Sequence, residues 1–165
     1  FFLDAIGKNC EKIVSVDPFC VVDFQESKNA KIVPLDAFKF VKTFEGKADA
    51  VLLLRSLHDI LKGRKKSLKE FLDGIEEMLA FQGRLIICDP FYNPKKKFSR
   101  QKILRLRKTQ EEFLGHSHSP RDFIRPEKIK AAAKPSLKVL REEFCPVGFG
   151  KEGELLLYWL VFEKW

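Results

Sequence analysis

Short apolar runs alternate along the chain with segments whose apolar residues recur at helical spacing. The runs predict strands at residues 13–16, 32–35, 49–54 and 84–89. The unbroken run at 49–54 is typical of a strand buried on both faces. Residues 67–79 have the helical spacing, with Ser67 and Glu70 as a capping box, and shorter helices are expected at 1–6 and 21–27. Strands separated by helices predict parallel βαβ units with right-handed crossovers.

The carboxyl-terminal half departs from this alternation. Residues 137–144 and 154–162 are predicted strands, and the Gly-rich link between them favours an antiparallel hairpin. Residues 91–135 precede the hairpin, and Pro126 marks a helix start within them. We expect this long segment to be a helical, substrate-side insertion over the carboxyl edge of the sheet. The predicted class is therefore α/β, a Rossmann-like, mostly parallel sheet with a C-terminal antiparallel β-hairpin and helices on both faces.

Two carboxylates follow the first two predicted strands. Asp17 closes the strand at 13–16 and is followed by Pro18, while Asp36 closes the strand at 32–35. Open α/β sheets bind their ligands at the carboxyl edge of the strands. The two acids therefore predict a pocket for a ligand with several hydroxyl or amino donors.

Composition narrows the class of protein. At 165 residues, 45% of them hydrophobic, the chain is expected to form one domain, 1–165, with a substantial core. No apolar run approaches the ~18 residues of a membrane helix. The cysteines are widely scattered, which favours reduced thiols and a cytoplasmic protein over a disulfide framework or zinc site. They are Cys10, Cys20, Cys88 and Cys145.

A series of segments, taken in order, carries a resemblance to a known family. They are residues 13–18, 35–37, 48–53, 57–60 and 78–87. In this order and spacing the chain resembles the class I S-adenosylmethionine-dependent methyltransferases over nearly its whole length. The resemblance implies that S-adenosylmethionine is the cofactor and that its sulfonium methyl passes directly, in line, to an acceptor that the sequence does not identify.

The resemblance also implies roles for individual residues. Asp17, with Pro18 beside it, corresponds to the acid that holds the ribose of the cofactor. Asp36 corresponds to the acid that contacts the adenine amino group, and Ala37 supplies a backbone N–H beside the ring. The segment from Arg55 to His58 corresponds to the border between the methionine end of the cofactor and the substrate.

The chain departs from the family pattern at its amino-terminal end. The family places a first strand and a glycine-rich turn before the helix that leads into the second strand, and this chain has no G-x-G motif. We expect residues 1–6 to be the end of that helix, so that the domain is incomplete at its amino-terminal side. The chain begins at Phe1 without a leader, which suggests a piece of a longer protein.

Other residues are candidates for chemistry. The run from Asp89 to Tyr92 resembles the D-P-P-Y signature of amino-methylating enzymes, but it follows the fifth strand rather than the fourth, and a strand-ending turn is the favoured interpretation. His58 is a candidate general base. Tyr92, His116 and His118 are candidate substrate-side residues, and no metal set accompanies the histidines.

A net charge of +8 leaves two interpretations open, a polyanionic partner or a lysine-rich solvated surface. Residues 95–108 are basic with interleaved apolar residues. They suit a phosphate-contacting helix or an ordinary amphipathic helix with Ile103, Leu104 and Leu106 inward. The second functional hypothesis is accordingly a non-catalytic methyltransferase-like module that binds nucleic acid or another polyanion. No membrane partner is expected.

Overall fold

A computed structural model describes residues 10–16, 30–62, 68–93, 99–114, 122–146 and 155–165. The helices expected at 1–6 and 21–27 lie outside the described residues. The chain divides into two compact units, residues 1–45 and residues 46–165, which are described in turn.

The described residues of the first unit form two parallel strands and a helix. Strands β1 (Ile13–Val16) and β2 (Ala30–Val33) pair in parallel from one end to the other. β2 ends two residues earlier than predicted, because the chain turns at Pro34 and the Leu35 N–H donates to the Val33 carbonyl. Helix α2 (Ala37–Thr43) then begins. Asp36 is thus the N-cap of a helix rather than the last residue of a strand.

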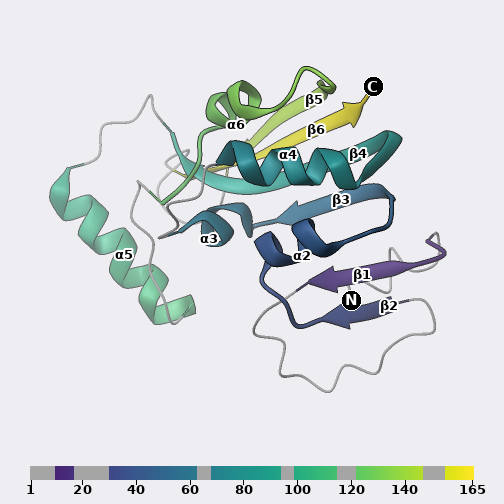
Figure 1. Cartoon of the computed structure of the whole chain (residues 1–165). Helices are drawn as coiled ribbons and strands as arrows, with labels where there is room; N and C mark the ends of the chain where they lie inside the picture. Colours follow the sequence, from purple (N-terminus) through teal and green to yellow (C-terminus); the bar gives the residue numbers. More distant parts are fainter. Residues whose placement is uncertain (1–9, 17–29, 63–67, 94–98, 115–121, 147–154) are drawn as a thin grey trace. The chain divides into compact units, whose positions relative to one another are not determined.

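The second unit contains a four-stranded sheet in the order β3-β4-β6-β5 (Figure 1). Its strands are β3 (Ala48–Leu54), β4 (Leu79–Tyr92), β5 (Leu137–Pro146) and β6 (Leu155–Lys164). β3 and β4 are parallel, whereas β6 runs antiparallel to both β4 and β5. The fold class is therefore confirmed as α/β, with parallel strands followed by a C-terminal antiparallel hairpin.

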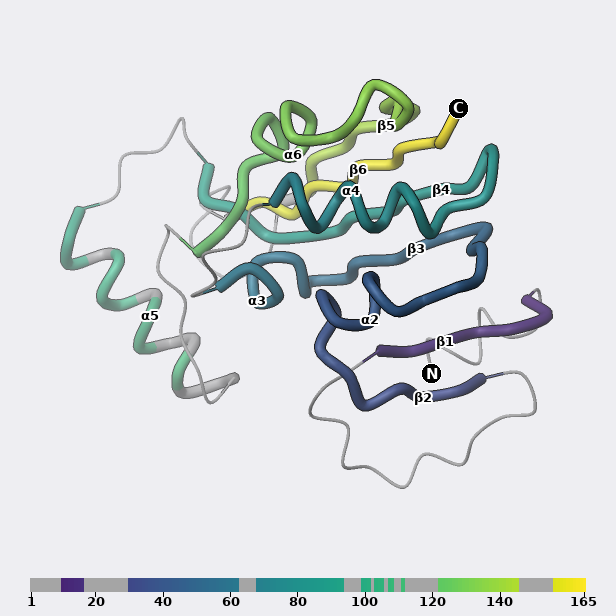
Figure 2. Tube along the Cα trace, viewed as in Figure 1, coloured from purple at the N-terminus to yellow at the C-terminus, as the bar shows by residue number. Residues whose placement is uncertain are grey.

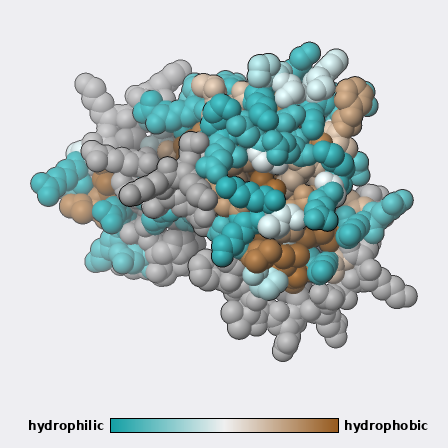
Figure 3. Space-filling view, in the orientation of Figure 1, coloured by the Kyte–Doolittle hydropathy of each residue, from teal (hydrophilic) through white to brown (hydrophobic). Residues whose placement is uncertain are grey.

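Helices connect these strands, as the trace in Figure 2 shows for the described residues. They are α3 (Leu57–Leu61), α4 (Leu68–Met78), α5 (Arg100–Leu114) and α6 (Pro126–Ala132). α4 carries the predicted apolar stripe, and its Phe71, Leu72 and Ile75 are fully buried. α6 lies beside α4 and begins at Pro126, as the sequence predicts. In Figure 3 the described surface over α4 and α6 is mostly hydrophilic, so these helices turn their polar sides outward.

The sheet corrects one prediction about burial. Leu53 is buried, but Leu52 is 39% exposed, so β3 is not covered on both faces. Among the described residues β3 is the edge strand of its sheet, and an unbroken apolar run does not reveal that position.

β4 is longer than predicted at its start. It begins at Leu79, passes a bulge opposite Ala48 and Ala50, and continues through Gly83. A Cβ at Gly83 would lie 2.8 Å from the Ala80 carbonyl oxygen and 3.0 Å from that of Ala48. The glycine is therefore needed because two backbone segments approach it closely.

β4 also continues beyond its predicted end, so the interpretation of Asp89–Tyr92 as a strand-ending turn is wrong. The Arg55 N–H donates to the Cys88 carbonyl, which shows that Cys88 directs its backbone polar groups toward β3. The backbone polar groups of successive strand residues point to opposite sides, so the nitrogen of Pro90 faces the same side as the polar groups of Cys88. On that side β3 has already ended at Leu54. The missing N–H of Pro90 therefore costs no ladder bond, and pairing with β6 continues to Tyr92.

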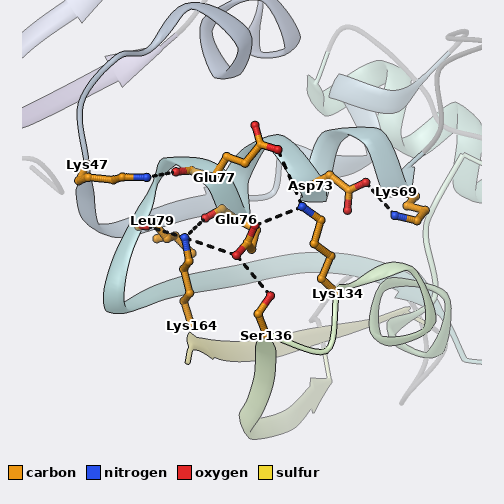
Figure 4. A network of polar contacts seen from close by, with 9 residues as sticks. All are labelled: Lys47, Lys69, Asp73, Glu76, Glu77, Leu79, Lys134, Ser136 and Lys164. Atoms are coloured by element: carbon orange, nitrogen blue, oxygen red, sulfur yellow. Dashed lines mark hydrogen bonds and ion pairs between the residues drawn. The ribbon is translucent and has the colours of Figure 1, made fainter.

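A polar network joins the end of α4 to the strands (Figure 4). Lys164 of β6 donates to the backbone carbonyls of Glu76 and Leu79, at 2.7 and 3.0 Å, which satisfies acceptors left open at the helix end. The Glu76 carboxylate lies 3.4 Å from Lys164 and 3.3 Å from Lys134, and it accepts a hydrogen bond from Ser136. Burial opposes ionisation of Glu76, but the contacts with the two lysines prevail and lower its pKa.

Candidate functional site

The carboxyl ends of β3 and β4 meet at one edge of the sheet, because the two strands are parallel. His58 follows β3 on α3, and Asp89 lies near the end of β4. Their side chains are among the least exposed polar groups of the described residues, with His58 4% and Asp89 0% exposed. Most buried polar groups in proteins are hydrogen-bonded, and the partners of these two residues are described first.

His58 and Asp89 are joined by several contacts. The backbone N–H of His58 donates to Asp89 Oδ2 at 3.1 Å. Nδ1 of the ring lies 2.9 Å from Oδ1 and 3.0 Å from Oδ2 of the same carboxylate. On its other side, Nε2 lies 3.4 Å from Oδ2 of Asp59, a side chain that is 50% exposed. The ring thus lies between a fully buried carboxylate and one that reaches solvent.

Aromatic rings lie against this pair. The Phe123 ring centroid is 5.0 Å from that of His58 and 5.4 Å from that of Tyr92. Phe123 belongs to the long segment that leaves β4, which therefore contributes to this edge of the sheet. Apart from its place in that segment, nothing in the sequence marks Phe123 as a site residue.

The backbone between β3 and α3 is held in an unusual conformation. Arg55 has a φ of 53°, in the left-handed region that non-glycine residues seldom occupy. Its N–H donates to the Cys88 carbonyl at 2.6 Å, next to the residue that holds His58. Such conformations cost of order 1–3 kcal/mol and concentrate at functional sites.

Burial perturbs the ionisable groups of this region. It raises the pKa of Asp89, although the contacts with His58 oppose the shift. Tyr158, the cross-strand neighbour of Asp89 on β6, has its pKa raised by burial and by the nearby Asp89 and Cys88. Its hydroxyl is buried and has no hydrogen-bond partner among the described residues. A buried hydroxyl without a partner is energetically costly.

The predicted site residues are distributed over the two units. Arg55, His58 and Tyr92 gather at the carboxyl edge of the second unit, where Tyr92 is buried beside Phe123. Asp36 and Ala37 belong to the first unit. Four predicted residues lie outside the described residues, namely Asp17, Pro18, His116 and His118.

Asp36 has a structural role that the sequence interpretation missed. Its Oδ1 accepts hydrogen bonds from the N–H groups of Phe38 and Lys39, at 3.1 and 3.3 Å, and so caps α2. A carboxylate accepts several hydrogen bonds, so the cap does not exclude the predicted contact with a ligand.

Metal-binding clusters and membrane-spanning helices are both absent from the described residues. They include no group of three or more His, Cys, Asp or Glu side chains that would hold a metal ion. None of the helices in the described ranges is both long and apolar enough to cross a membrane.

Proteins with a similar fold are found among solved structures. No family model and no curated protein sequence matches the chain. Among solved structures, it is similar to the N-methyltransferase NodS from Bradyrhizobium japonicum WM9, with a TM-score of 0.59, 14% identity, and coverage of 99% of this chain and 79% of that one. NodS is also known in complex with S-adenosyl-L-homocysteine, and there the match covers 71% of its chain.

Further solved structures have a similar fold. The MccD protein matches with a TM-score of 0.65 and 12% identity, over 98% of this chain and 83% of that one. An S-adenosylmethionine-dependent methyltransferase from Anabaena variabilis ATCC 29413 matches with a TM-score of 0.55 and 10% identity, over 99% and 72%. At these identities the similarity shows the fold alone.

Proposed function

We propose that this chain, which has the fold of the class I S-adenosylmethionine-dependent methyltransferases, acts as such an enzyme or as part of one. The observation that carries the proposal is the similarity to NodS and the Anabaena enzyme over 99% of the chain. NodS binds S-adenosyl-L-homocysteine, the product left after methyl transfer. The buried His58–Asp89 pair at the carboxyl edge supports the proposal, because ligands of open α/β sheets bind at that edge.

The chain's residues fit the cofactor in their chemistry. We assign the ribose hydroxyls to Asp17 and Pro18, and the adenine amino group to the carboxylate of Asp36 with the N–H of Ala37 beside the ring. Arg55 is exposed, and its guanidinium suits the carboxylate at the methionine end. The cofactor supplies an activated methyl group, so the protein has mainly to position the acceptor and exclude water.

His58 is the candidate general base of this site, and the segment 91–135 is the candidate substrate lobe. Within that segment Tyr92, His116 and His118 are the proposed substrate-side residues. Helices α5 and α6 lie within that segment. α6, however, packs against α4. Phe123 is the described residue of this segment whose ring is shown to lie against His58.

Calorimetry with S-adenosyl-L-homocysteine tests the proposal. Asp36→Ala is expected to weaken binding by roughly 1–3 kcal/mol, the usual cost of a lost charge-assisted hydrogen bond. Asp36→Ser separates the two roles of this residue, since serine still caps α2 but lacks the carboxylate. Asp49→Ala, at an exposed position of β3, is the matched control and should leave binding unchanged.

Two results would contradict the assignment. Absence of binding by the parental chain would remove the proposal that this chain by itself holds the cofactor. Parental affinity in both Asp36 variants would remove Asp36 from the site while leaving the cofactor in place.

α5 supports a second candidate function, that of a non-catalytic module that binds nucleic acid. The inward orientation expected for Leu104 is wrong, because this side chain is 55% exposed. Arg100, Arg105 and Arg107 of the same helix are exposed as well. An exposed helix with several arginines suits a phosphate backbone better than a core-facing amphipathic helix does.

Filter binding to a short single-stranded RNA tests this second function. The affinity should fall steeply between about 50 and 200 mM salt. Replacing the three arginines by glutamine should reduce both the affinity and the salt slope. A triple control at the exposed Lys12, Lys31 and Lys39 carries the same change in charge. Equal losses in both triple variants would show nonspecific attraction by net charge and would contradict nucleic-acid binding by α5.

A further inference from the structure

We infer that the methyl acceptor is a nucleic acid strand, which the basic helix α5 holds beside the carboxyl edge of β3 and β4. Methyl transfer and nucleic-acid binding are then two steps of one activity. This substrate class rests on the proposed methyltransferase function, because that function gives the bound strand a reaction at this edge.

The positive charge of the chain is concentrated in one short segment. Residues 95–108 include eight basic residues and no acidic one. The net charge of the whole chain is also +8, so the remaining residues contribute none. In α5 the acidic residues, Glu111 and Glu112, come only in the last turn. A lysine-rich surface that serves solubility would spread its charge, whereas one basic segment on an otherwise neutral chain is typical of a site for a polyanion.

The helix that carries this charge is tied at both ends to the candidate site. The chain leaves the sheet at Tyr92 and returns at Phe123, and the centroids of these two rings are 5.4 Å apart. Phe123 also lies against His58, with 5.0 Å between the ring centroids. α5 begins eight positions after Tyr92 and ends nine positions before Phe123. Neither end of α5 is therefore more than about 32 Å from these two residues. A strand of about ten nucleotides covers that distance.

The exposed side of α5 suits a nucleic acid better than a lipid surface. Arg100, Arg105 and Arg107 are exposed, and guanidinium groups bind phosphate oxygens through paired hydrogen bonds. Leu104 is 55% exposed and is a surface neighbour of Arg100, four residues before it, and of Arg107, three residues after it. A helix that lies in a membrane surface keeps its apolar residues on one face, apart from its charges. An exposed leucine among arginines instead fits a strand that presents both phosphates and bases.

The chemical step needs no further reactant. A lone pair on a base nitrogen or a sugar hydroxyl oxygen forms a bond to the methyl carbon, and the electrons of the carbon–sulfur bond remain on sulfur. A proton carried by the acceptor atom leaves to water. A base has to leave its stack before it can react, so single strands are expected to be better acceptors than duplexes.

Transfer of a labelled methyl group tests the acceptor class. The probes are random-sequence RNA and DNA of about 20 nucleotides, each as a single strand and as a duplex. We expect label in at least one of the single strands, at a rate that falls as salt is added. The triple glutamine variant of the α5 arginines should lower kcat/KM about 10–100-fold, mainly through KM, and the triple lysine control less than about threefold. Equal losses in the two variants would overturn the role of α5.

Calorimetry with S-adenosyl-L-homocysteine separates this substrate class from the proposed function. If the chain binds this ligand but labels neither RNA nor DNA, the acceptor class is wrong and the proposed function stands. If the chain neither binds the ligand nor labels a nucleic acid, both are wrong.

Photo-crosslinking with RNA and DNA that contain thiopyrimidines tests the geometry without turnover. Peptides from α5 and peptides that contain Tyr92 or Phe123 should both be crosslinked, because the strand runs from the helix to the carboxyl edge. Crosslinks to α5 alone would indicate a non-catalytic binding module and overturn the inference. Tighter binding to vesicles of phosphatidylcholine and phosphatidylserine than to either nucleic acid would overturn it as well.

Discussion

Glu76→Gln tests the network that fastens the end of α4. The substitution keeps the shape of the side chain and removes its charge. The carboxylate is 12% exposed and lies 3.3–3.4 Å from two lysine ammonium groups. At an effective dielectric constant of about 20 each such pair is worth about 5 kcal/mol before desolvation. Desolvation and the partial exposure of both lysines offset most of this, so we expect a net loss of roughly 1–3 kcal/mol.

The pH dependence of this loss follows from the lowered pKa of Glu76. A carboxyl whose pKa is lower in the folded state stabilises the fold fully above its unfolded value, here about 4.5. That stabilisation is lost as the pH falls below 4.5 and through the folded value. Urea unfolding of both chains should therefore show a difference at neutral pH that shrinks in acid. Glu77→Gln is the control, since this neighbour is 76% exposed and should cost less than about 0.5 kcal/mol.

Two results would refute this reasoning. Equal unfolding free energies for the Glu76→Gln and parental chains at neutral pH would show that desolvation cancels the attraction. A difference that persists unchanged in acid would show that the loss is not electrostatic.

Two further predictions concern the backbone. Gly83→Ala should destabilise the fold by roughly 1–3 kcal/mol in urea unfolding, because its Cβ would press on two carbonyl oxygens; an unchanged midpoint would contradict the close approach. Arg55→Gly should leave stability unchanged or raise it by up to about 1 kcal/mol, since glycine adopts a φ of 53° without strain, while calorimetry should show weaker binding of S-adenosyl-L-homocysteine. Parental affinity in that variant would remove Arg55 from the cofactor site.

Local patterns predicted the elements that local sequence determines. The strand at 13–16 is confirmed residue for residue, because an apolar run with polar residues on either side defines it. The stripe of α4 and the antiparallel hairpin are confirmed for similar reasons. The partial exposure of β3 was missed, since edge position depends on neighbouring strands that the run itself does not encode.

The candidate site shows the same limit. The place of His58 after a strand makes it a candidate from sequence. Its partner Asp89 is 31 residues away, and the sequence places it at the end of a strand, in a D-P-P-Y-like run, without indicating the contact with His58. The rule that gave Asp17 and Asp36 their roles, an acid near the end of a parallel strand, applies to Asp89 as well. Only the pairing of β4 with β3 and β6 reveals that Asp89 is buried and directed at His58.

The most direct test of the central claim is a crystal structure of the chain with S-adenosyl-L-homocysteine. We predict the adenine amino group on Asp36, the ribose hydroxyls on Asp17, and the homocysteine end beside the segment from Arg55 to His58. A bound ligand that touches none of these residues would contradict the proposed cofactor site, as would crystals that remain without it at saturating concentration.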